Sequence, residues 1–272
     1  MDENETTKLK KYYENSYPFA QMFDLFRVND RREFSLTLAN EAYLRYNTFN
    51  TVQEFKSIVC EKVPTKFDIG AIYKERPQKG LNNIPEKKEL VFDIDLTDYP
   101  RDCCTGKSIC SICFTIIKVS VKLLNYILSQ EFGFKKIKFF FSGNRGLHCW
   151  VFDEDALLLD GLERKSLTGY INYVNQKGLF VEEYINILKE YFDLKDHKEL
   201  IEKYYLKLDA KVSHDLNHLL KAPFCIHPLS KKVCIPVHAR NIDDLYLDDI
   251  PTLSDVINEP SILDEYVKEL LF

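Results

Sequence analysis

The segment Glu89–Thr97 reads Glu-Leu-Val-Phe-Asp-Ile-Asp-Leu-Thr and decides the expected fold. Its alternation of apolar and acidic residues predicts a β-strand, in which successive side chains point to opposite faces. We expect Phe92 and Ile94 to pack into a core, while Asp93 and Asp95 project together from the other face. Two close carboxylates repel each other unless a cation lies between them, and hard oxygen ligands favour Mg²⁺ or Mn²⁺. An exposed strand edge with two ordinary aspartates is the alternative.

The rest of the chain predicts strands on both sides of a helical block. Helical spacing of apolar residues covers residues 8–26, with an interruption near Pro18, and residues 113–132. Strand patterns cover residues 32–37, 42–46, 67–73, 137–141, 147–152, 206–212 and 232–237. Leucine-rich helical periodicity runs from 154 to 205, with a break near Gly178. We therefore predict a mixed α/β (α+β) fold, in which a mixed β-sheet catalytic core (1–153 and 206–272) carries a small inserted helical subdomain (154–205).

Composition limits the class of protein. The chain has 272 residues, 45% of them hydrophobic, which is enough to bury a sizeable core. Its formal net charge of −5 argues against a surface coated in positive charge, so a nucleic acid would need a local basic groove. The polar, acidic N-terminal decapeptide does not resemble a secretory signal. We find no uninterrupted apolar run of about 18 residues and expect an intracellular protein without a membrane span.

A glycine-containing turn follows an apolar strand at Phe141–His148. Two glycines three residues apart allow a tight turn and a close approach of backbone N–H groups to an anion. The Ser142 hydroxyl, the Arg145 guanidinium and the His148 ring can all donate hydrogen bonds to phosphate oxygens. The segment therefore predicts a triphosphate-binding turn. A hairpin turn with an exposed arginine is the plainer alternative.

A third carboxylate, Asp209, lies on a predicted strand and leads into a segment with several basic groups. His218, Lys221 and His227 follow within eighteen residues of it. Each histidine alone is more typical of a surface or core position than of a site. Together, these residues are interpreted as the far wall of an anion-binding pocket.

Four of the eight cysteines lie within residues 103–113. In a chain without a secretory signal, such clustering favours metal binding over disulfides. Cys103, Cys104, Cys110 and Cys113 could supply four thiolates to a closed tetrahedral Zn²⁺ site, whose role would be structural. Four free buried thiols are the alternative.

Taken in order, these motifs resemble the small (catalytic) subunit of archaeal/eukaryotic-type DNA primase, especially its eukaryotic form. The resemblance rests on the Asp-x-Asp strand with Thr97–Tyr99, the cysteine cluster, and the Ser-Gly-x-Arg-Gly-x-His-Cys-Trp turn. It continues through Leu-Asp-x-x-Val-Ser at Leu208–Ser213, Asn-His-Leu-Leu-Lys-x-Pro-Phe at Asn217–Phe224, and His227. Arg32–Ser35 and Tyr43–Tyr46 near the start belong to the same pattern. The motifs span roughly residues 10 to 240 in the family's order.

The resemblance implies a template-directed nucleotidyltransferase of DNA replication and the primosome. Such an enzyme uses ribonucleoside triphosphates to synthesise short RNA primers de novo on single-stranded DNA and releases pyrophosphate. It implies two catalytic Mg²⁺ or Mn²⁺ ions and one structural Zn²⁺. The implied partners are an iron–sulfur-containing primase large subunit, the DNA polymerase alpha complex, the DNA template and the RNA primer. The implied location is the nucleus.

The resemblance also implies roles for individual residues. Asp93, Asp95 and Asp209 match the carboxylates that bind the catalytic ions, and the four clustered cysteines match the zinc ligands. Asp68 matches a residue that reaches the ribose 2′-OH, and Glu33 a further active-site residue. The other residues implied to bind the nucleotide are Arg45, Lys66, Ser142, Arg145, His148, His218, Lys221 and His227. One departure is Asn144, which stands where animal members carry a second arginine.

Two other functional classes fit part of the pattern. A metal-dependent phosphohydrolase or nuclease would also use three aspartates but would consume nucleotides or strands. A non-catalytic zinc-bearing scaffold would contain the cysteine cluster without needing Asp93, Asp95 and Arg145 together.

Overall fold

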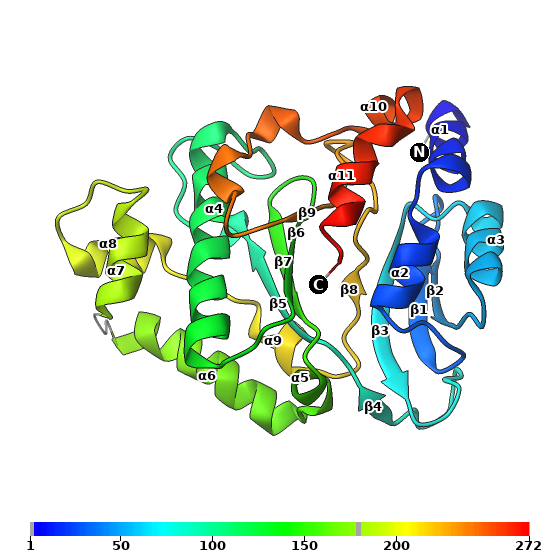
Figure 1. Cartoon of the computed structure of the whole chain (residues 1–272), viewed down its shortest axis with the longest axis horizontal. Coiled ribbons are helices and arrows are strands. Elements are labelled where there is room, and N and C mark those ends of the chain that lie inside the picture. Colours follow the sequence, from blue (N-terminus) through cyan, green and yellow to red (C-terminus); the bar gives the residue numbers. More distant parts are fainter. Residues whose placement is uncertain (1–2, 178–180, 272) are drawn as a thin grey trace. The chain divides into compact units, whose positions relative to one another are not determined.

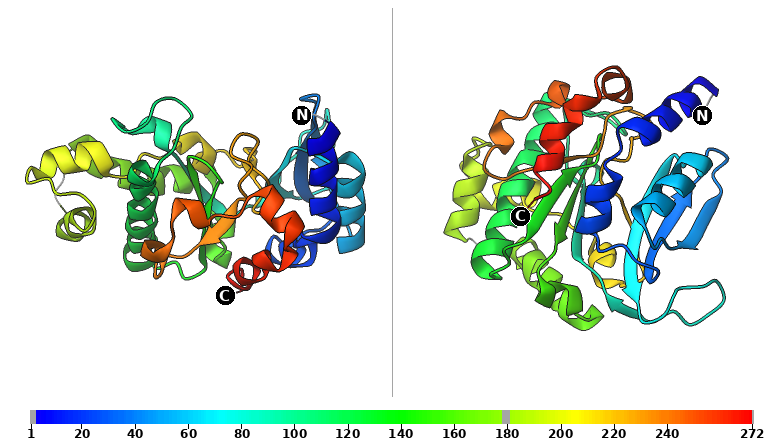
Figure 2. Two further views of the ribbon diagram at one scale, coloured as in Figure 1. Left: turned by 90° about the horizontal axis from the view of Figure 1, so that it is seen from above. Right: turned by 45° about the vertical axis from the view of Figure 1, so that its right-hand side comes forward.

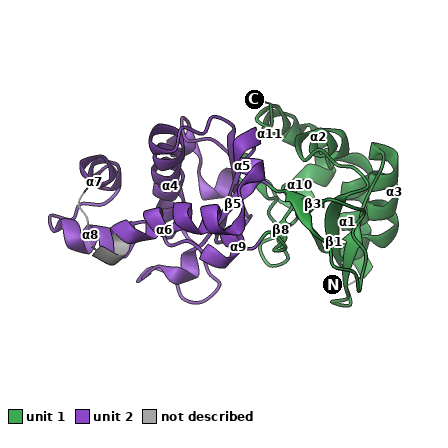
Figure 3. Cartoon of the chain, turned by 90° about the horizontal axis from the view of Figure 1, so that it is seen from below, with its two compact units in different colours: residues 1–88, 216–236, 250–272 green, residues 89–215, 237–249 purple. Residues whose placement is uncertain are grey.

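The computed structural model describes residues 3–177 and 181–271, which form two compact units (Figures 1 and 3). Unit 1 comprises residues 1–88, 216–236 and 250–272, and unit 2 comprises residues 89–215 and 237–249. Each unit has its own antiparallel sheet, with helices packed on it. The predicted mixed α+β class is confirmed.

The sheet of unit 1 has the strand order β2-β1-β3-β4, with β8 also paired to β3 (Figure 1). Its strands are listed here by their bounds: β1 (Arg32–Thr37), β2 (Tyr43–Asn47), β3 (Lys66–Tyr73), β4 (Pro85–Lys87) and β8 (Leu220–Lys221). The helices of this unit are α1 (Glu3–Asn15), α2 (Phe19–Leu25), α3 (Val52–Lys62), α10 (Leu253–Asn258) and α11 (Leu263–Lys268). The predicted interruption near Pro18 is the break between α1 and α2.

An aromatic cluster holds the N-terminal helices on one face of this sheet. Phe55 of α3 lies edge-on to Phe19 of α2 at 5.0 Å and to Phe67 of β3 at 5.7 Å, measured between ring centroids. Tyr17 packs against Phe67 at 5.3 Å. Edge-to-face geometry at these distances adds to the burial of apolar area. Glu33 of β1 and Asp68 of β3 are each next in sequence to a phenylalanine of this cluster's face, so their side chains lie on the opposite face of the sheet.

The sheet of unit 2 has the order β5-β7-β6-β9, with β9 at the point where the chain passes from unit 1 to unit 2. Its strands are β5 (Leu90–Asp95), β6 (Ile137–Phe141), β7 (Gly146–Val151) and β9 (Ile235–Val237). β5 and β7 pair in antiparallel register, so that Asp93 lies opposite His148 and Asp95 opposite Gly146. This register brings the Asp-x-Asp motif to the same end of the sheet as the glycine-containing turn between β6 and β7.

The long apolar helix α4 (Ser111–Tyr126) lies along this sheet and continues as a π-helical turn, η2 (Ile127–Glu131) (Figures 1 and 2). The combined segment Ser111–Glu131 is long and apolar enough to cross a membrane by length and composition, but 61% of its apolar window is buried within the fold. The core helix of a soluble protein has the same properties. The helical segment ends close to the predicted position 132, and Gly133, with φ +77°, follows it.

Residues 154–205 are mainly helical in the part that the structure describes. This stretch contains α5 (Glu154–Leu158), α6 (Gly161–Lys177), α7 (Glu182–Lys189) and α8 (His197–Tyr204). The whole stretch lies within unit 2, which comprises residues 89–215 and 237–249. The predicted boundaries of an inserted subdomain at 153 and 206 therefore stay a prediction. The predicted break near Gly178 lies outside the described residues.

The strand predicted at residues 206–212 is wrong. Residues 210–214 form a short helix, α9 (Ala210–His214), and Asp209 is its N-cap, with its carboxylate accepting a hydrogen bond from the Lys211 N–H at 3.1 Å. Aspartate satisfies the first free N–H groups of a helix, and this local preference overrides the strand pattern. The strand predicted at 232–237 is shorter than expected, because only Ile235–Val237 forms it.

Candidate active site and metal centre

β5 presents its two aspartates on the polar face of the unit 2 sheet. Phe92 and Ile94 are fully buried, whereas the side chains of Asp93 and Asp95 are 28% and 40% exposed. The alternation predicted from the sequence is therefore present. The Asp95 carboxylate is fixed by Thr97, whose N–H and hydroxyl donate to it at 2.8 and 2.9 Å. Rotation of this carboxylate would break both bonds, so its direction is set by the turn that follows the strand.

Asp209 lies beside this strand although it is more than a hundred residues away in sequence. Its backbone N–H donates to the carbonyl oxygen of Asp93 at 3.0 Å. The hydroxyl of the buried Tyr99 accepts from the Lys207 N–H at 3.0 Å and ties down the same segment. Burial raises the pKa of Tyr99 to about 12, so this hydroxyl stays neutral at physiological pH. The backbone of Asp209 therefore lies beside Asp93, and its carboxylate caps α9. The metal-binding role of the three aspartates stays a prediction.

A fourth acidic residue, Asp98, adds to the negative charge. Its pKa is raised by partial burial and by the nearby carboxylates of Asp95 and Asp209. A carboxyl group that resists ionisation next to other carboxylates indicates an excess of negative charge, which a cation would relieve. The donor set consists of oxygens, as Mg²⁺ and Mn²⁺ require.

The turn between β6 and β7, residues 142–146, is called here the glycine turn. Ser142 and Gly146 close it: the Ser142 N–H donates to the Gly146 carbonyl at 2.8 Å, and the Gly146 N–H donates to the Ser142 hydroxyl at 2.9 Å. Gly143 has φ +90°, a conformation that glycine adopts without strain. Gly146 has no room for a Cβ, which would lie 2.9 Å from the Ser142 Oγ. Both glycines are therefore favoured by the geometry of the turn, whereas the approach of an anion to it stays a prediction.

Arg145 of this turn and His148 of β7 lie close to the two strand aspartates. The Arg145 Nη2 lies 3.5 Å from the Asp95 carboxylate, and its Nη1 donates to the Gly106 carbonyl at 3.2 Å. Its Nε is buried and forms no hydrogen bond with the described residues. The His148 Nε2 lies 3.7 Å from an Asp93 carboxylate oxygen. A guanidinium and an imidazole therefore lie within 4 Å of the carboxylates of Asp95 and Asp93.

The four clustered cysteines also converge. The Sγ atoms of Cys103, Cys104, Cys110 and Cys113 all lie within 4.8 Å of one another, and those of Cys110 and Cys113 are 3.9 Å apart. In a filled tetrahedral Zn²⁺ site the sulfur–sulfur distance is about 3.8 Å, given a Zn–S bond of about 2.3 Å. The arrangement therefore fits a four-thiolate metal centre without rearrangement of the chain.

The start of α4 favours a thiolate in this cluster. Cys110 is the N-cap of α4, and hydrogen bonding from the Cys113 N–H is the main cause that lowers its pKa to about 7. In contrast, interaction with Cys110 raises the pKa of Cys104 to about 12. One negative charge is thus accommodated by the helix N-terminus, and further thiolates would need a cation.

The remaining predicted nucleotide-binding residues belong to unit 1. Glu33 is fully buried and accepts from Arg45 at 2.8 and 3.0 Å and from the Tyr73 hydroxyl at 2.9 Å. The hydrogen bond from Arg45 to this carboxylate raises the pKa of Arg45. The pKa of Tyr73 is raised mainly by burial and further by the charge of Glu33. Arg45 therefore already has a counter-ion in this structure, and Glu33 is the group that orients it.

Asp68 is held by one residue of the neighbouring strand β1 and one of its own strand β3. It accepts from the Ser35 hydroxyl at 3.0 Å, and the Lys66 Nζ lies 3.5 Å from it. In the antiparallel register of β3 and β8, Lys221 lies opposite Asp68. His218 lies half-buried just before β8. The Nδ1 of His227 accepts from the backbone N–H groups of the turn that follows it.

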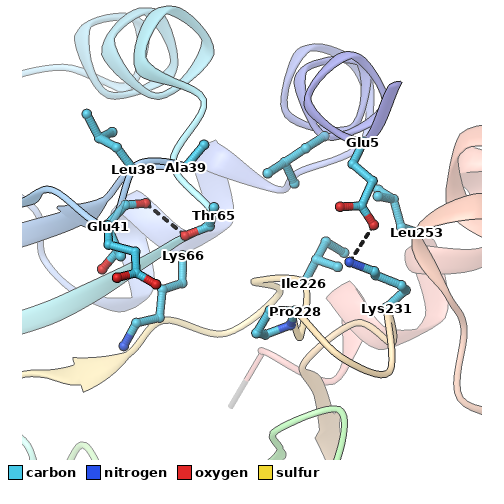
Figure 4. Close-up of a pocket in the computed structure, with 12 residues that line it drawn as sticks. Glu5, Leu38, Ala39, Glu41, Thr65, Lys66, Ile226, Pro228, Lys231 and Leu253 are labelled. Carbon is cyan, nitrogen blue, oxygen red and sulfur yellow. Dashed lines mark hydrogen bonds and ion pairs between the residues drawn. The ribbon is translucent and has the colours of Figure 1, made fainter. Parts of the chain in front are cut away.

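Unit 1 also contains a pocket of about 400 Å³ next to Lys66 (Figure 4). Lys66 lines one end, and the ion pair between Glu5 and Lys231, 2.6 Å long, lines the other. Leu9, Leu38, Ala39, Ile226, Pro228 and Leu253 supply much of the apolar surface between them. No sequence pattern predicted this pocket, because its walls come from five separated segments.

The family described as DNA primase small subunit matches residues 92–239, which is more than half of the chain. The chain belongs to the DNA primase small subunit family. This confirms the predicted resemblance, and the matched segment includes all three aspartates, the glycine turn and the cysteine cluster.

Relatives in the family include both eukaryotic and archaeal proteins. The DNA primase small subunit of Schizosaccharomyces pombe is 29% identical, with 92% of this chain and 76% of the relative covered. That of Saccharomyces cerevisiae is 28% identical over 85% of this chain and 81% of the relative, and PriS of Pyrobaculum islandicum is 28% identical over 85% and 78%. Among solved structures, the polymerase domain of Mycobacterium tuberculosis Ligase D in complex with DNA matches with a TM-score of 0.49 and 13% identity, covering 97% of this chain and 91% of that chain.

Several supporting residues had no predicted role. Thr97 and Asp98 belong to the motif after the strand. Thr97 fixes Asp95, and Asp98 adds a fourth carboxylate. Ser35 and Tyr73 orient Asp68 and Glu33. Such partners carry no spacing signal, since each is defined by the group that it touches in the fold.

Proposed function

We propose that this chain is the catalytic subunit of a DNA primase, which polymerises ribonucleoside triphosphates into short RNA primers on single-stranded DNA. The observation that carries the proposal is the backbone hydrogen bond between Asp209 and Asp93, because it places the third acidic residue beside the Asp-x-Asp strand. Membership of the family supports nucleotidyl transfer as the class of reaction. The carboxylates of Asp93 and Asp95, next to the hydrogen-bond donors of the glycine turn, form a site suited to that reaction.

Asp93, Asp95 and Asp209 would bind two divalent ions. When bound, these ions supply charge neutralisation at the α-phosphate and lower the pKa of the attacking 3′-hydroxyl. The chain's own residues then act by positioning and by charge compensation, as is general for phosphoryl transfer. Thr97 holds the Asp95 carboxylate in one direction, and the backbone of β5 fixes the spacing between Asp93 and Asp95.

The glycine turn would hold the triphosphate of the incoming nucleotide. Arg145 offers a planar guanidinium with a buried Nε–H that a phosphate oxygen could satisfy. His148 would donate from its Nε2, which lies near Asp93, and Ser142 would keep the turn closed while its hydroxyl faces the same region. The short, rigid turn limits the reorganisation needed on binding.

Unit 1 would contribute the remaining nucleotide contacts. We propose that Arg45, Lys66, His218, Lys221 and His227 contact the nucleotide, that Asp68 accepts from the ribose 2′-OH, and that Glu33 orients Arg45. Ser35 and Lys66 fix the Asp68 carboxylate, which leaves it able to accept a further hydrogen bond from a sugar hydroxyl. Substitution of Asp68 by Ala should therefore reduce discrimination between ATP and dATP.

The cysteine cluster would bind one structural Zn²⁺. A closed four-thiolate site leaves no coordination position for water, so the ion would stabilise the loop rather than take part in the reaction.

We also propose a primase large subunit and the DNA polymerase alpha complex as partners, with a nuclear location. Support comes from the relatives' shared designation as small subunits and from the eukaryotic relatives among them. Template binding should be sequence-tolerant and should weaken as salt rises, because it would depend on phosphate contacts.

The test is primer synthesis by the purified chain on unprimed poly(dT) with ATP and Mg²⁺ or Mn²⁺, with and without the large subunit. We expect short RNA products, which should disappear in Asp95→Asn. The matched control is Asp155→Asn, which removes one exposed carboxylate from α5 elsewhere in unit 2. Loss of nucleotide or template without product would instead indicate a hydrolase. No reaction in either preparation would favour a zinc-bearing scaffold.

A further inference from the structure

The cysteine loop, residues 102–110, is hydrogen-bonded to the glycine turn. The Gly106 carbonyl accepts from the Arg145 Nη1 at 3.2 Å, and the Lys107 carbonyl accepts from the Asn144 side-chain amide at 3.4 Å. Asn144 is only 4% exposed, so its amide is not simply a surface group that happens to point at the loop. The two carbonyls belong to the stretch between the second and third clustered cysteines.

The same loop is held from within by Arg101. Its Nη2 donates to the Gly106 carbonyl at 2.9 Å, and its Nη1 donates to the Ser108 carbonyl at 2.8 Å. Gly106 is therefore shared by two guanidinium groups, one from the base of the loop and one from the glycine turn. Gly106 has φ +53°, so its peptide orientation relies on a backbone conformation that glycine favours.

The loop has little else to fix its shape. Residues 105–108 are exposed, and the Ser108 N–H to Thr105 carbonyl bond at 3.2 Å is the backbone bond recorded within this stretch. An exposed loop with few buried contacts opens at low free-energy cost. Its geometry in this structure therefore depends mainly on the convergence of the four thiols and on the Arg101 contacts.

Arg145 is in turn the group that faces Asp95, with its Nη2 3.5 Å from that carboxylate. A guanidinium held by a carbonyl at one nitrogen and a carboxylate at another has few alternative rotamers. If the carbonyl moved away, Arg145 would be attached through Asp95 alone and would sample other orientations. Holding it in advance lowers the ordering cost of binding an anion.

We propose that the cysteine loop and Arg101 act as positioning elements for Arg145, so that metal at the cysteines sets the affinity for the nucleotide triphosphate. The contact passes through the Gly106 carbonyl, and neither Arg101 nor the metal touches the nucleotide. This rests on the proposed function, since Arg145 is taken as a triphosphate ligand.

The test compares ATP binding and primer synthesis by the full chain, in complex with its large subunit, for Arg101→Ala, Arg101→Lys and Lys107→Ala. Lys107→Ala is the matched charge control: it removes a positive charge from the same loop but keeps the Lys107 carbonyl. Zinc content and thermal melting are measured for every preparation. ATP dissociation constants are measured with Mg²⁺ by calorimetry, and KM and kcat by primer synthesis.

We expect Arg101→Ala to raise the ATP dissociation constant and KM about tenfold, roughly what loss of one hydrogen bond to a charged group produces, while kcat changes by less than about twofold. Arg101→Lys should be intermediate, because an amine can still hold one carbonyl. Lys107→Ala should stay within about twofold of wild type. Removal of zinc from the wild-type protein should raise the ATP dissociation constant at least as much as Arg101→Ala does.

Equal ATP affinity in Arg101→Ala and Lys107→Ala would overturn the proposal, as would a fall in kcat at unchanged KM. If Arg101→Ala loses zinc or melts at a lower temperature, the proposal is tested with Asn144→Ala instead. That variant removes only the hydrogen bond from Asn144 to the Lys107 carbonyl. A rise of about threefold in its ATP dissociation constant supports the proposal, and wild-type affinity refutes it. Failure of the wild-type complex to bind ATP would instead refute the proposed function.

Discussion

Replacement of Gly146 by alanine should disrupt the glycine turn by a direct steric clash. A Cβ at this position would lie 2.9 Å from the Ser142 Oγ and 3.2 Å from its Cβ. Ser142 is only 6% exposed and bonded to Gly146 through both its N–H and its hydroxyl, so it cannot move aside without breaking those bonds. Overpacking of a well-packed site costs about 1–3 kcal/mol and a lost hydrogen bond about 1 kcal/mol.

The reduced chain entropy of the unfolded alanine variant offsets about 0.4–1 kcal/mol of this. We therefore expect Gly146→Ala to lose about 1–3 kcal/mol of unfolding free energy and to melt several degrees lower. Because the turn carries Arg145, KM for ATP should rise by about tenfold. Thermal melting and primer synthesis at varied ATP measure the two effects.

Two further variants make the reasoning refutable. Gly169→Ala is the matched control, since a Cβ there meets nothing within 4 Å and alanine is favoured over glycine within α6 by up to about 1 kcal/mol. Ser142→Ala removes the atom of closest approach, so the double variant should be less destabilised than the sum of the single changes. A Gly146→Ala protein with wild-type melting temperature and ATP affinity would show that the clash, and the role of the turn, are wrongly assigned.

Three other outcomes are expected. Asp209→Asn should reduce primer synthesis by about two orders of magnitude or more, with little change in melting, because asparagine still caps α9; near-normal synthesis would refute its metal-binding role. Cys110→Ser should abolish stoichiometric zinc, and a chelator should lower the melting temperature of wild type but not of this variant. The pKa of His214, which contacts the Thr168 hydroxyl, is lowered mainly by partial burial and further by the positive charge of Lys165. Its stabilising contribution should therefore be complete above pH 6.5 and should be lost as pH falls through the lowered folded value, a dependence that His214→Gln would remove in pH-dependent melting.

The features predicted correctly from the sequence are those that local periodicity encodes. Asp93 and Asp95 share a face because strand side chains alternate with a period of two, and the burial of Phe92 and Ile94 follows from the same rule. The break at Pro18 likewise follows from proline's missing N–H donor. The convergence of the clustered cysteines was predicted because short spacing in sequence limits their separation in space.

The sequence by itself therefore determined the Asp-x-Asp strand, the glycine turn and the thiol cluster, each built from residues within a few positions of one another. Only the tertiary structure decided that Asp209 begins a helix beside Asp93, that Arg45 is paired with a buried Glu33, and that Arg145 is bonded to the cysteine loop. These contacts join segments separated by many residues. Their geometry comes from how sheets and helices pack, which no local pattern of residue types records.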